Sequence, residues 1–68
     1  MQVYVGKKIR QARRSKDLTL YQLSEMTGIS LNYLASIEKG RSNPTLNKLF
    51  IISKCLDIPL GELLPEKV

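Results

Sequence analysis

Residues 18–40 read LTLYQLSEMTGISLNYLASIEKG, and this stretch decides the fold. Thr19 is a favourable N-cap, and Gln22 three residues later completes a T-x-x-Q capping box. Gly28 can adopt the left-handed conformation that ends a helix without steric cost. Together these signals predict a helix over Leu20–Thr27.

A second helix is expected directly after this one. Ser30 is a favourable N-cap and Gly40 a favourable end, so residues 31–39 are predicted to be helical. The connection between the two helices is a very short turn that contains glycine. That spacing is typical of a helix-turn-helix, in which the second helix stands at a steep angle to the first.

The second predicted helix has two different faces. At about 100° per residue, Leu34 and Ile37 lie on one side, where they can be buried. Asn32 and Ser36 lie on the opposite side, and Lys39 is the first charged residue on that side. An amide can pair in bidentate fashion with adenine in the major groove of DNA, so this face is a candidate reading surface. An ordinary solvated face is the alternative.

The flanking segments also have helical periodicity. Residues 3–15 and 46–56 each carry an apolar stripe, Thr45 caps the later of the two, and Pro59 suits the first turn of a last short helix over 60–64. The stripe residues are Val5, Ile9 and Ala12 in the earlier segment and Leu46, Leu49, Ile52 and Leu56 in the later one. No segment alternates apolar and polar residues, so no sheet is expected. The sequence predicts an all-α fold of five short helices, in one domain over residues 1–68.

The composition of the chain narrows the class of function. The 68 residues include no histidine and a single cysteine, so neither a His/Cys zinc cluster nor a Cys–His or Ser–His catalytic pair can form within the chain. We therefore expect a protein that is not an enzyme and needs neither a metal nor a cofactor. No apolar run approaches the ~20 residues of a membrane span, and the start of the chain lacks an apolar signal-peptide segment. A cytoplasmic protein without a membrane partner is expected.

The charge of the chain is unevenly distributed. The formal net charge is +5, and residues 1–41 carry eight Lys or Arg against three Asp or Glu, whereas residues 42–68 carry three of each. A one-sided excess of positive charge suits the binding of a polyanion. A solvated basic helix is the alternative that charge alone leaves open.

The order of these motifs resembles the phage-repressor/Cro (Xre) type of helix-turn-helix domain over almost everything from Gly6 to Leu64. The residues that carry the resemblance are Ile9, Arg10 and Arg13 in the first helix, Leu23 and Ser24 in the second, Gly28, Ile29 and Ser30 at the turn, and Ile37, Glu38 and Gly40 at the end of the third. The resemblance implies a compact lambda-repressor-like domain that binds double-stranded DNA sequence-specifically as part of a transcriptional regulator. It also implies a homodimer on a near-palindromic operator.

Two positions depart from the family pattern. Leu20 stands where the family often has a glutamine that helps to hold a phosphate, and Ile51 replaces a residue that is usually polar. The apolar Ile51 indicates a partner surface, and we expect it to form a dimer interface with Leu60 and Leu64. A protein-interaction module of the antitoxin or adaptor type is the alternative function that this surface would serve.

Helical position and the resemblance together assign roles to the remaining residues. Leu31, Asn32 and Ser36 are expected to read bases in the major groove. Glu38 falls on the buried side of its helix and so needs a partner, and the family pairs this position with Arg13 in a structural ion pair. The expected phosphate contacts are Ser30, Tyr33, Lys39, Arg41, Asn43, Arg10 and Arg14.

Overall fold

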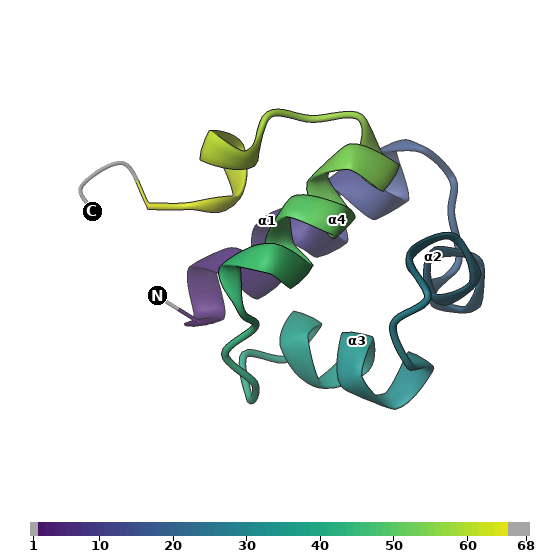
Figure 1. Cartoon of the computed structure of the whole chain (residues 1–68), viewed down its shortest axis with the longest axis horizontal. Helices are drawn as coiled ribbons and strands as arrows, with labels where there is room; N and C mark the ends of the chain where they lie inside the picture. Colours follow the sequence, from purple (N-terminus) through teal and green to yellow (C-terminus); the bar gives the residue numbers. More distant parts are fainter. Residues whose placement is uncertain (1, 66–68) are drawn as a thin grey trace.

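The computed structural model describes residues 2–65, which form four α-helices and one 3-10 turn. In chain order these are α1 (Gln2–Ser15), α2 (Leu20–Thr27), α3 (Leu31–Glu38), α4 (Leu46–Leu56) and the turn η1 (Leu60–Leu63). Figure 1 shows α1 behind α4, with α2 and α3 toward the right and below and η1 toward the upper left. No strand occurs in this part of the chain, so the all-α prediction is confirmed. The start of α1 and the end of α3 each lie one residue earlier than predicted, a shift that is ordinary at helix ends.

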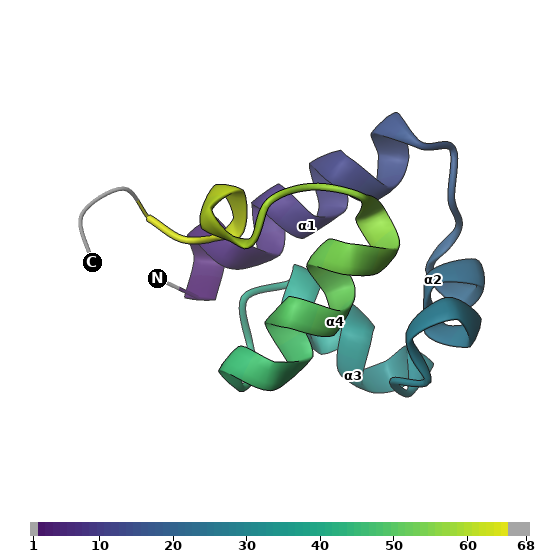
Figure 2. The same cartoon turned by 45° about the horizontal axis from the view of Figure 1, so that its top comes forward.

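The core lies where the helices face one another. α1 packs against α3, α4 and η1, and α2 packs against α3 and α4. Figure 2 shows η1 alongside α1. The buried hydrophobic residues are Val5, Ile9, Leu23, Ile29, Leu34, Ile37, Leu49, Ile52, Leu56 and Leu63. Every helix and the turn η1 contribute at least one of them, so α2 and α3 are anchored on the same core as α1 and α4.

The turn between α2 and α3 is held by local hydrogen bonds. Thr19 and Gln22 form the predicted capping box at the start of α2, with bonds of 3.0 Å and 2.8 Å. Gly28 has a φ of 73°, a left-handed conformation that a side chain would strain. The hydroxyl of Ser24 donates to the carbonyl of Ile29 at 2.6 Å and so ties α2 to the start of α3. The orientation of α3 at this end therefore rests on contacts within the motif.

The last element of the chain differs from the prediction. A fifth helix is expected over residues 60–64, but η1 is a single 3-10 turn of four residues. Its backbone bonds join residues three apart, from Glu62 to the carbonyl of Pro59 and from Leu64 to that of Gly61. Four residues that follow a proline and include a glycine are too few to build a series of i→i−4 bonds. The five-helix prediction is wrong in this element.

Leu46 also lies elsewhere than predicted. The sequence places it in the buried stripe of α4, yet it is 64% exposed. At about 100° per residue, Leu46 lies roughly 90° from the centre of the stripe that Leu49, Ile52 and Leu56 form, and roughly 40° from Phe50. Phe50 is exposed as well. The two side chains therefore form a separate apolar face of α4 that points away from the core.

Candidate nucleic-acid interface

The outer face of α3 is open to solvent. Its inner face is held on the core by Leu34 and Ile37, which are 0% and 1% exposed. On the outer face Leu31 and Asn32 are both exposed, so an apolar side chain and an amide stand side by side in the first turn. Ala35 keeps the middle of the helix small. A short helix presented in this way can enter a DNA major groove with its first turn leading.

Ser36 lies on the same face, and its hydroxyl already makes one hydrogen bond within the protein. Its Oγ forms a hydrogen bond with the Oγ of Ser42, which lies in the loop after α3. The backbone N–H of Arg41 donates to the Ser36 carbonyl at 3.0 Å. Either hydroxyl can be the donor, and a hydroxyl that makes one bond keeps capacity for another. The loop is thus tied to the outer face of α3.

Ser30 and Tyr33 lie at the N-terminal end of α3. The Oγ of Ser30 accepts from the backbone N–H of Tyr33 at 3.1 Å, so Ser30 is the N-cap. The ring of Tyr33 is half-buried and packs against the core. The Nζ of Lys48 in α4 lies 5.7 Å from the centroid of that ring, within range of a cation–π contact. This contact brings a cation from α4 to the side of α3.

Polar and cationic side chains follow the end of α3. Lys39 is the C-cap of the helix, and Arg41 and Asn43 lie in the loop after it; all three side chains are exposed. Arg14, in the last turn of α1, is exposed too. An anion that approaches the residues after α3 therefore meets the cations of Lys39 and Arg41 and the amide of Asn43.

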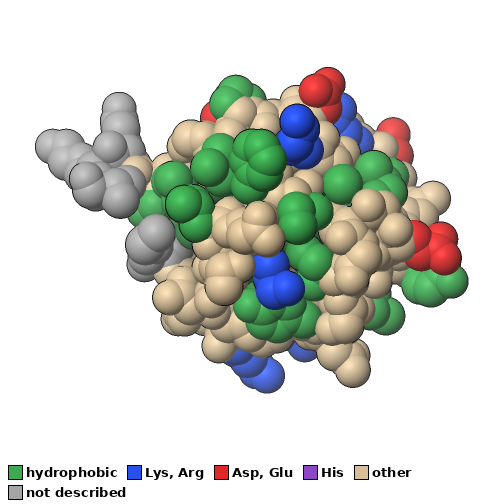
Figure 3. All heavy atoms as spheres, in the orientation of Figure 1, with side chains coloured by type: hydrophobic (Ala, Val, Ile, Leu, Met, Phe, Trp, Pro, Cys, Tyr) green, Lys and Arg blue, Asp and Glu red, His purple; other side chains and the backbone are tan. Residues whose placement is uncertain are grey.

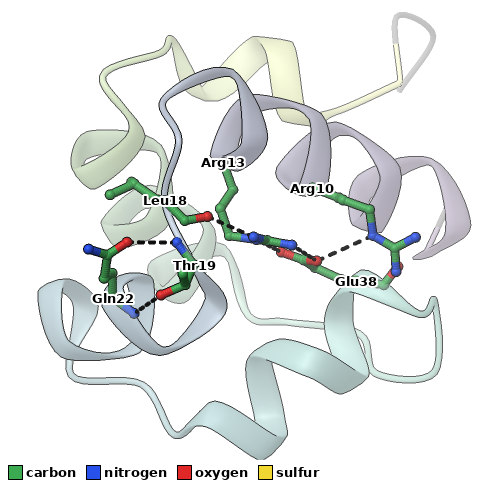
Figure 4. Close-up of polar contacts among 6 residues, drawn as sticks. All are labelled: Arg10, Arg13, Leu18, Thr19, Gln22 and Glu38. Atoms are coloured by element: carbon green, nitrogen blue, oxygen red, sulfur yellow. Dashed lines mark hydrogen bonds and ion pairs between the residues drawn. The ribbon is translucent and has the colours of Figure 1, made fainter.

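A buried carboxylate joins α1 to α3 (Figure 4). The side chain of Glu38 is 3% exposed and accepts from the Nε and Nη2 of Arg13 at 2.7 Å and 3.0 Å. Arg13 also donates from Nη1 to the carbonyl of Leu18 at 2.7 Å. Hydrogen bonding to Glu38 raises the pKa of Arg13 above its ordinary value and outweighs the opposing effect of burial. Charge-assisted bonds of this length hold the two helices together.

Arg10 shares the same carboxylate. Its Nε lies 3.3 Å from the Oε1 of Glu38, and its Nη2 donates to the backbone carbonyl of Glu38 at 3.5 Å. Figure 4 shows Arg10 and Arg13 reaching from α1 toward Glu38. The sequence groups Arg10 with the phosphate contacts, but the structure turns its guanidinium toward the end of α3, because the buried carboxylate there attracts a second cation.

A separate apolar surface lies over α4 and η1. The three residues predicted for the dimer interface, Ile51, Leu60 and Leu64, are all half-buried. The exposed side chains are those of Leu46 and Phe50, which line a shallow hollow together with Leu60. Figure 3 shows hydrophobic side chains gathered over this part of the molecule. The apolar surface therefore centres on Leu46 and Phe50 rather than on Ile51.

Three residues of these surfaces are not predicted from the sequence: Phe50, Lys48 and Ser42. Phe50 could have been found on a helical wheel, because it falls near Leu46 and away from the core stripe. Lys48 and Ser42 carry no such signal. Their contacts with Tyr33 and Ser36 join separate elements across a loop, and the spacing along the chain does not encode them.

The candidate site is a surface and not a pocket. In residues 2–65, no group of three or more His, Cys, Asp or Glu side chains could hold a metal ion. Every buried side-chain nitrogen and oxygen in this range has a hydrogen-bond partner. Across the same range, none of the helices combines the length and the apolar character needed to span a membrane.

Comparisons with known proteins point to one family. A family model described as Helix-turn-helix, HTH_3, matches residues 9–63. The transcriptional regulator SinR of Bacillus subtilis (strain 168) is 38% identical over 64 residues, which cover 93% of this chain and 58% of SinR. The immunity repressor protein of Bacillus phage phi105 is 36% identical over 63 residues, which cover 93% of this chain and 44% of the repressor. This chain thus spans about half the length of these two relatives.

A solved structure agrees with the same assignment. The restriction-modification controller protein C.AhdI from Aeromonas hydrophila superimposes with a TM-score of 0.89 at 28% sequence identity. The match covers 93% of this chain and 96% of C.AhdI. The arrangement of helices described above is therefore shared with a protein of nearly the same extent.

Proposed function

The chain belongs to the helix-turn-helix family HTH_3, and on this premise we propose that it is the DNA-binding domain of a transcriptional regulator. The names of its relatives, a transcriptional regulator and an immunity repressor, support this role. Because the chain spans about half the length of those relatives, the activity of the whole protein is part of the proposal. The proposed role requires no metal, cofactor or catalytic residue, and it places the protein in the cytoplasm.

One observation carries the proposal: one face of α3 packs on the core, and the other exposes an amide and small side chains to solvent. Leu34 and Ile37 anchor it, while Asn32 is exposed at its start. A helix of eight residues is marginal by itself in water, so its orientation depends on that anchoring. Base recognition needs such a fixed helix, because hydrogen bonds to base edges tolerate little displacement.

The proposed reading chemistry follows from the side chains of this face. α3 enters the major groove with its first turn leading, and the amide of Asn32 pairs with the donor and acceptor edge of an adenine. Leu31 packs on the methyl group of a nearby thymine. Ser36 adds a less specific polar contact through the capacity that its bond to Ser42 leaves free.

The proposed phosphate contacts flank this face. They are Ser30, Tyr33, Lys39, Arg41, Asn43 and Arg14. Contacts of this kind set the register of the protein on the duplex but carry no base information. Arg10 is left out of this set because Glu38 holds its guanidinium.

The proposed homodimer forms through the apolar surface over α4 and η1. Leu46 and Phe50 stand exposed there beside the half-buried Leu60, with Ile51 and Leu64 completing the proposed interface. Clustered exposed apolar side chains mark sites of association. A two-fold dimer would present its two α3 helices to half-sites about one helical turn apart, ~34 Å, on a near-palindromic operator.

Salt dependence and sequence selection test the proposal. The logarithm of the affinity for duplex DNA is expected to fall linearly with the logarithm of the salt concentration, because cationic contacts release counterions from phosphates. Sites selected from a random DNA pool are expected to share a near-palindromic sequence. Weak binding that does not depend on salt, together with tight binding to a partner protein, would instead identify an interaction module of the antitoxin or adaptor type.

A further inference from the structure

The C-terminal end of α3 lies unusually close to the backbone of α1. A Cβ atom placed on Gly6 would stand 2.3 Å from the carbonyl oxygen of Ile37 and 2.9 Å from that of Glu38. No side chain fits at such distances, so the absence of one at Gly6 is what allows the two helices to meet. Arg10 follows one turn later on the same face of α1.

Arg10 contacts the end of α3 at two points. Its Nη2 donates to the backbone carbonyl of Glu38, which is the last residue of the helix, and its Nε lies against the carboxylate. The last carbonyls of a helix have no partner within it and carry the negative end of the helix dipole. A guanidinium there satisfies such a carbonyl and also holds the helix from the side.

Arg10 is not needed to neutralise Glu38. Arg13 occupies both carboxylate oxygens at 2.7 Å and 3.0 Å, and its side chain is 12% exposed. The contacts of Arg10 are longer, at 3.3 Å and 3.5 Å, and its side chain is 40% exposed. Arg13 alone pairs with both carboxylate oxygens, so balancing the buried charge does not by itself account for the position of Arg10.

We infer that Gly6 and Arg10 form a docking pair that sets the angle at which α3 meets DNA. Arg10 is then a positioning residue for base recognition, although it touches no base. The inference rests on the proposed function, since it assigns a role in DNA reading. The sequence-based role of Arg10 as a phosphate ligand is the competing explanation, and the two predict different measurements.

Because α3 is short, a restraint at its C-terminal end affects the position of every side chain on its outer face. Eight residues span about 12 Å, so a tilt of about 10° moves one end of the helix by about 2 Å relative to the other. At the N-terminal end, the bond between Ser24 and Ile29 restrains the helix. At the C-terminal end, α1 supplies the restraint. Loss of that restraint lets α3 pivot about its N-terminal end, which displaces Ser36 and changes the angle at which Asn32 meets a base edge. Lys39 and Arg41 keep their charges, so the dependence of binding on salt is retained.

The experiment compares base preference with salt dependence in Arg10→Ala, Arg10→Lys and Gly6→Ala. Preference is the ratio of affinities for a selected site and for random duplex, measured below the melting temperature of each variant. Arg10→Ala is expected to lower this ratio by roughly three- to tenfold, part of what one bidentate base contact supplies, with the salt slope unchanged. Arg10→Lys is expected to restore part of the base preference that Arg10→Ala loses. A lysine ammonium can reach the same carbonyl, but it lacks the planar guanidinium that bonds to the carbonyl and the carboxylate at once. Gly6→Ala is expected to lower the ratio as well.

Two reference variants make the outcomes distinct. Lys7→Ala removes an exposed cation from the same helix and is expected to leave the preference unchanged. Arg41→Ala reports the pattern of a phosphate ligand, with all sequences weakened alike and a salt slope lower by about one. If Arg10→Ala follows the Arg41→Ala pattern, or matches the parent in both measurements, the docking pair is refuted. A parent protein with no salt-dependent DNA binding would overturn the proposed function itself, and the docking role with it.

Discussion

Glu38→Gln is expected to lower the free energy of unfolding by about 2–3 kcal/mol. The substitution removes the charge on which Arg13 and Arg10 converge. Removing one partner of a buried ion pair costs ~3–5 kcal/mol, because the remaining charge is left uncompensated. Two features reduce the cost at this site. Glutamine keeps one oxygen acceptor, and the guanidinium of Arg13 also bonds to the carbonyl of Leu18 at 2.7 Å, so it retains a partner.

Urea denaturation followed by circular dichroism measures this effect. In thermal unfolding, a second measurement of the same effect, a loss of 2–3 kcal/mol corresponds to a melting temperature about 10–20 °C lower in a domain of this size. Glu25→Gln, which removes an exposed carboxylate from α2, is the matched control and is expected to stay within about 0.5 kcal/mol of the parent. If Glu38→Gln unfolds at the same urea concentration as this control, the reasoning is refuted.

The same pair predicts how the loss depends on pH. Hydrogen bonding to Glu38 raises the pKa of Arg13 on folding. A basic group with a raised pKa stabilises the fold at every pH below its unfolded value and loses this contribution only as the pH rises through the folded value. Because an arginine with a raised pKa keeps its proton throughout the ordinary pH range, the difference in free energy of unfolding between parent and variant is expected to stay constant from about pH 7 to pH 10. A difference that shrinks within that range contradicts this account of Arg13.

Three further predictions concern the reading face, the apolar surface and a helix end. Asn32→Ala is expected to remove about 1–3 kcal/mol of discrimination at one operator position, which selection from a random DNA pool would show as flattened preference there. Unchanged preference at every position would mean that the reading face is assigned wrongly. Phe50→Glu puts a charge into the apolar surface and is expected to convert the dimer into a monomer in sedimentation without loss of helical signal; a parent that is monomeric with and without DNA excludes this interface. Asp57 ends α4 with a φ of 58° and places a carboxylate at the helix C-terminus, so Asp57→Gly is expected to gain about 0.5–1 kcal/mol in thermal unfolding. No gain would show that Asp57 is not strained.

The sequence by itself determined the helix-turn-helix, because the signals for it are local. An N-cap acts on backbone N–H groups two or three residues away, so Thr19 and Ser30 place the starts of α2 and α3 correctly. The buried face of α3 follows from the 3.6-residue period in the same way. Local reasoning fails at residues 60–64, where the sequence permits a helix but four residues after Pro59 cannot sustain one.

Only the tertiary structure decided which partner each side chain takes. The sequence predicts both Arg10 and Arg14 as phosphate contacts. In the structure Arg10 turns to Glu38, because α1 crosses the end of α3 at that point. Ser36 meets Ser42 only because the loop folds back over α3. A flexible side chain can reach several partners, and its choice depends on the distances between helices. Those distances come from the packing of the whole core, which no spacing along the chain encodes.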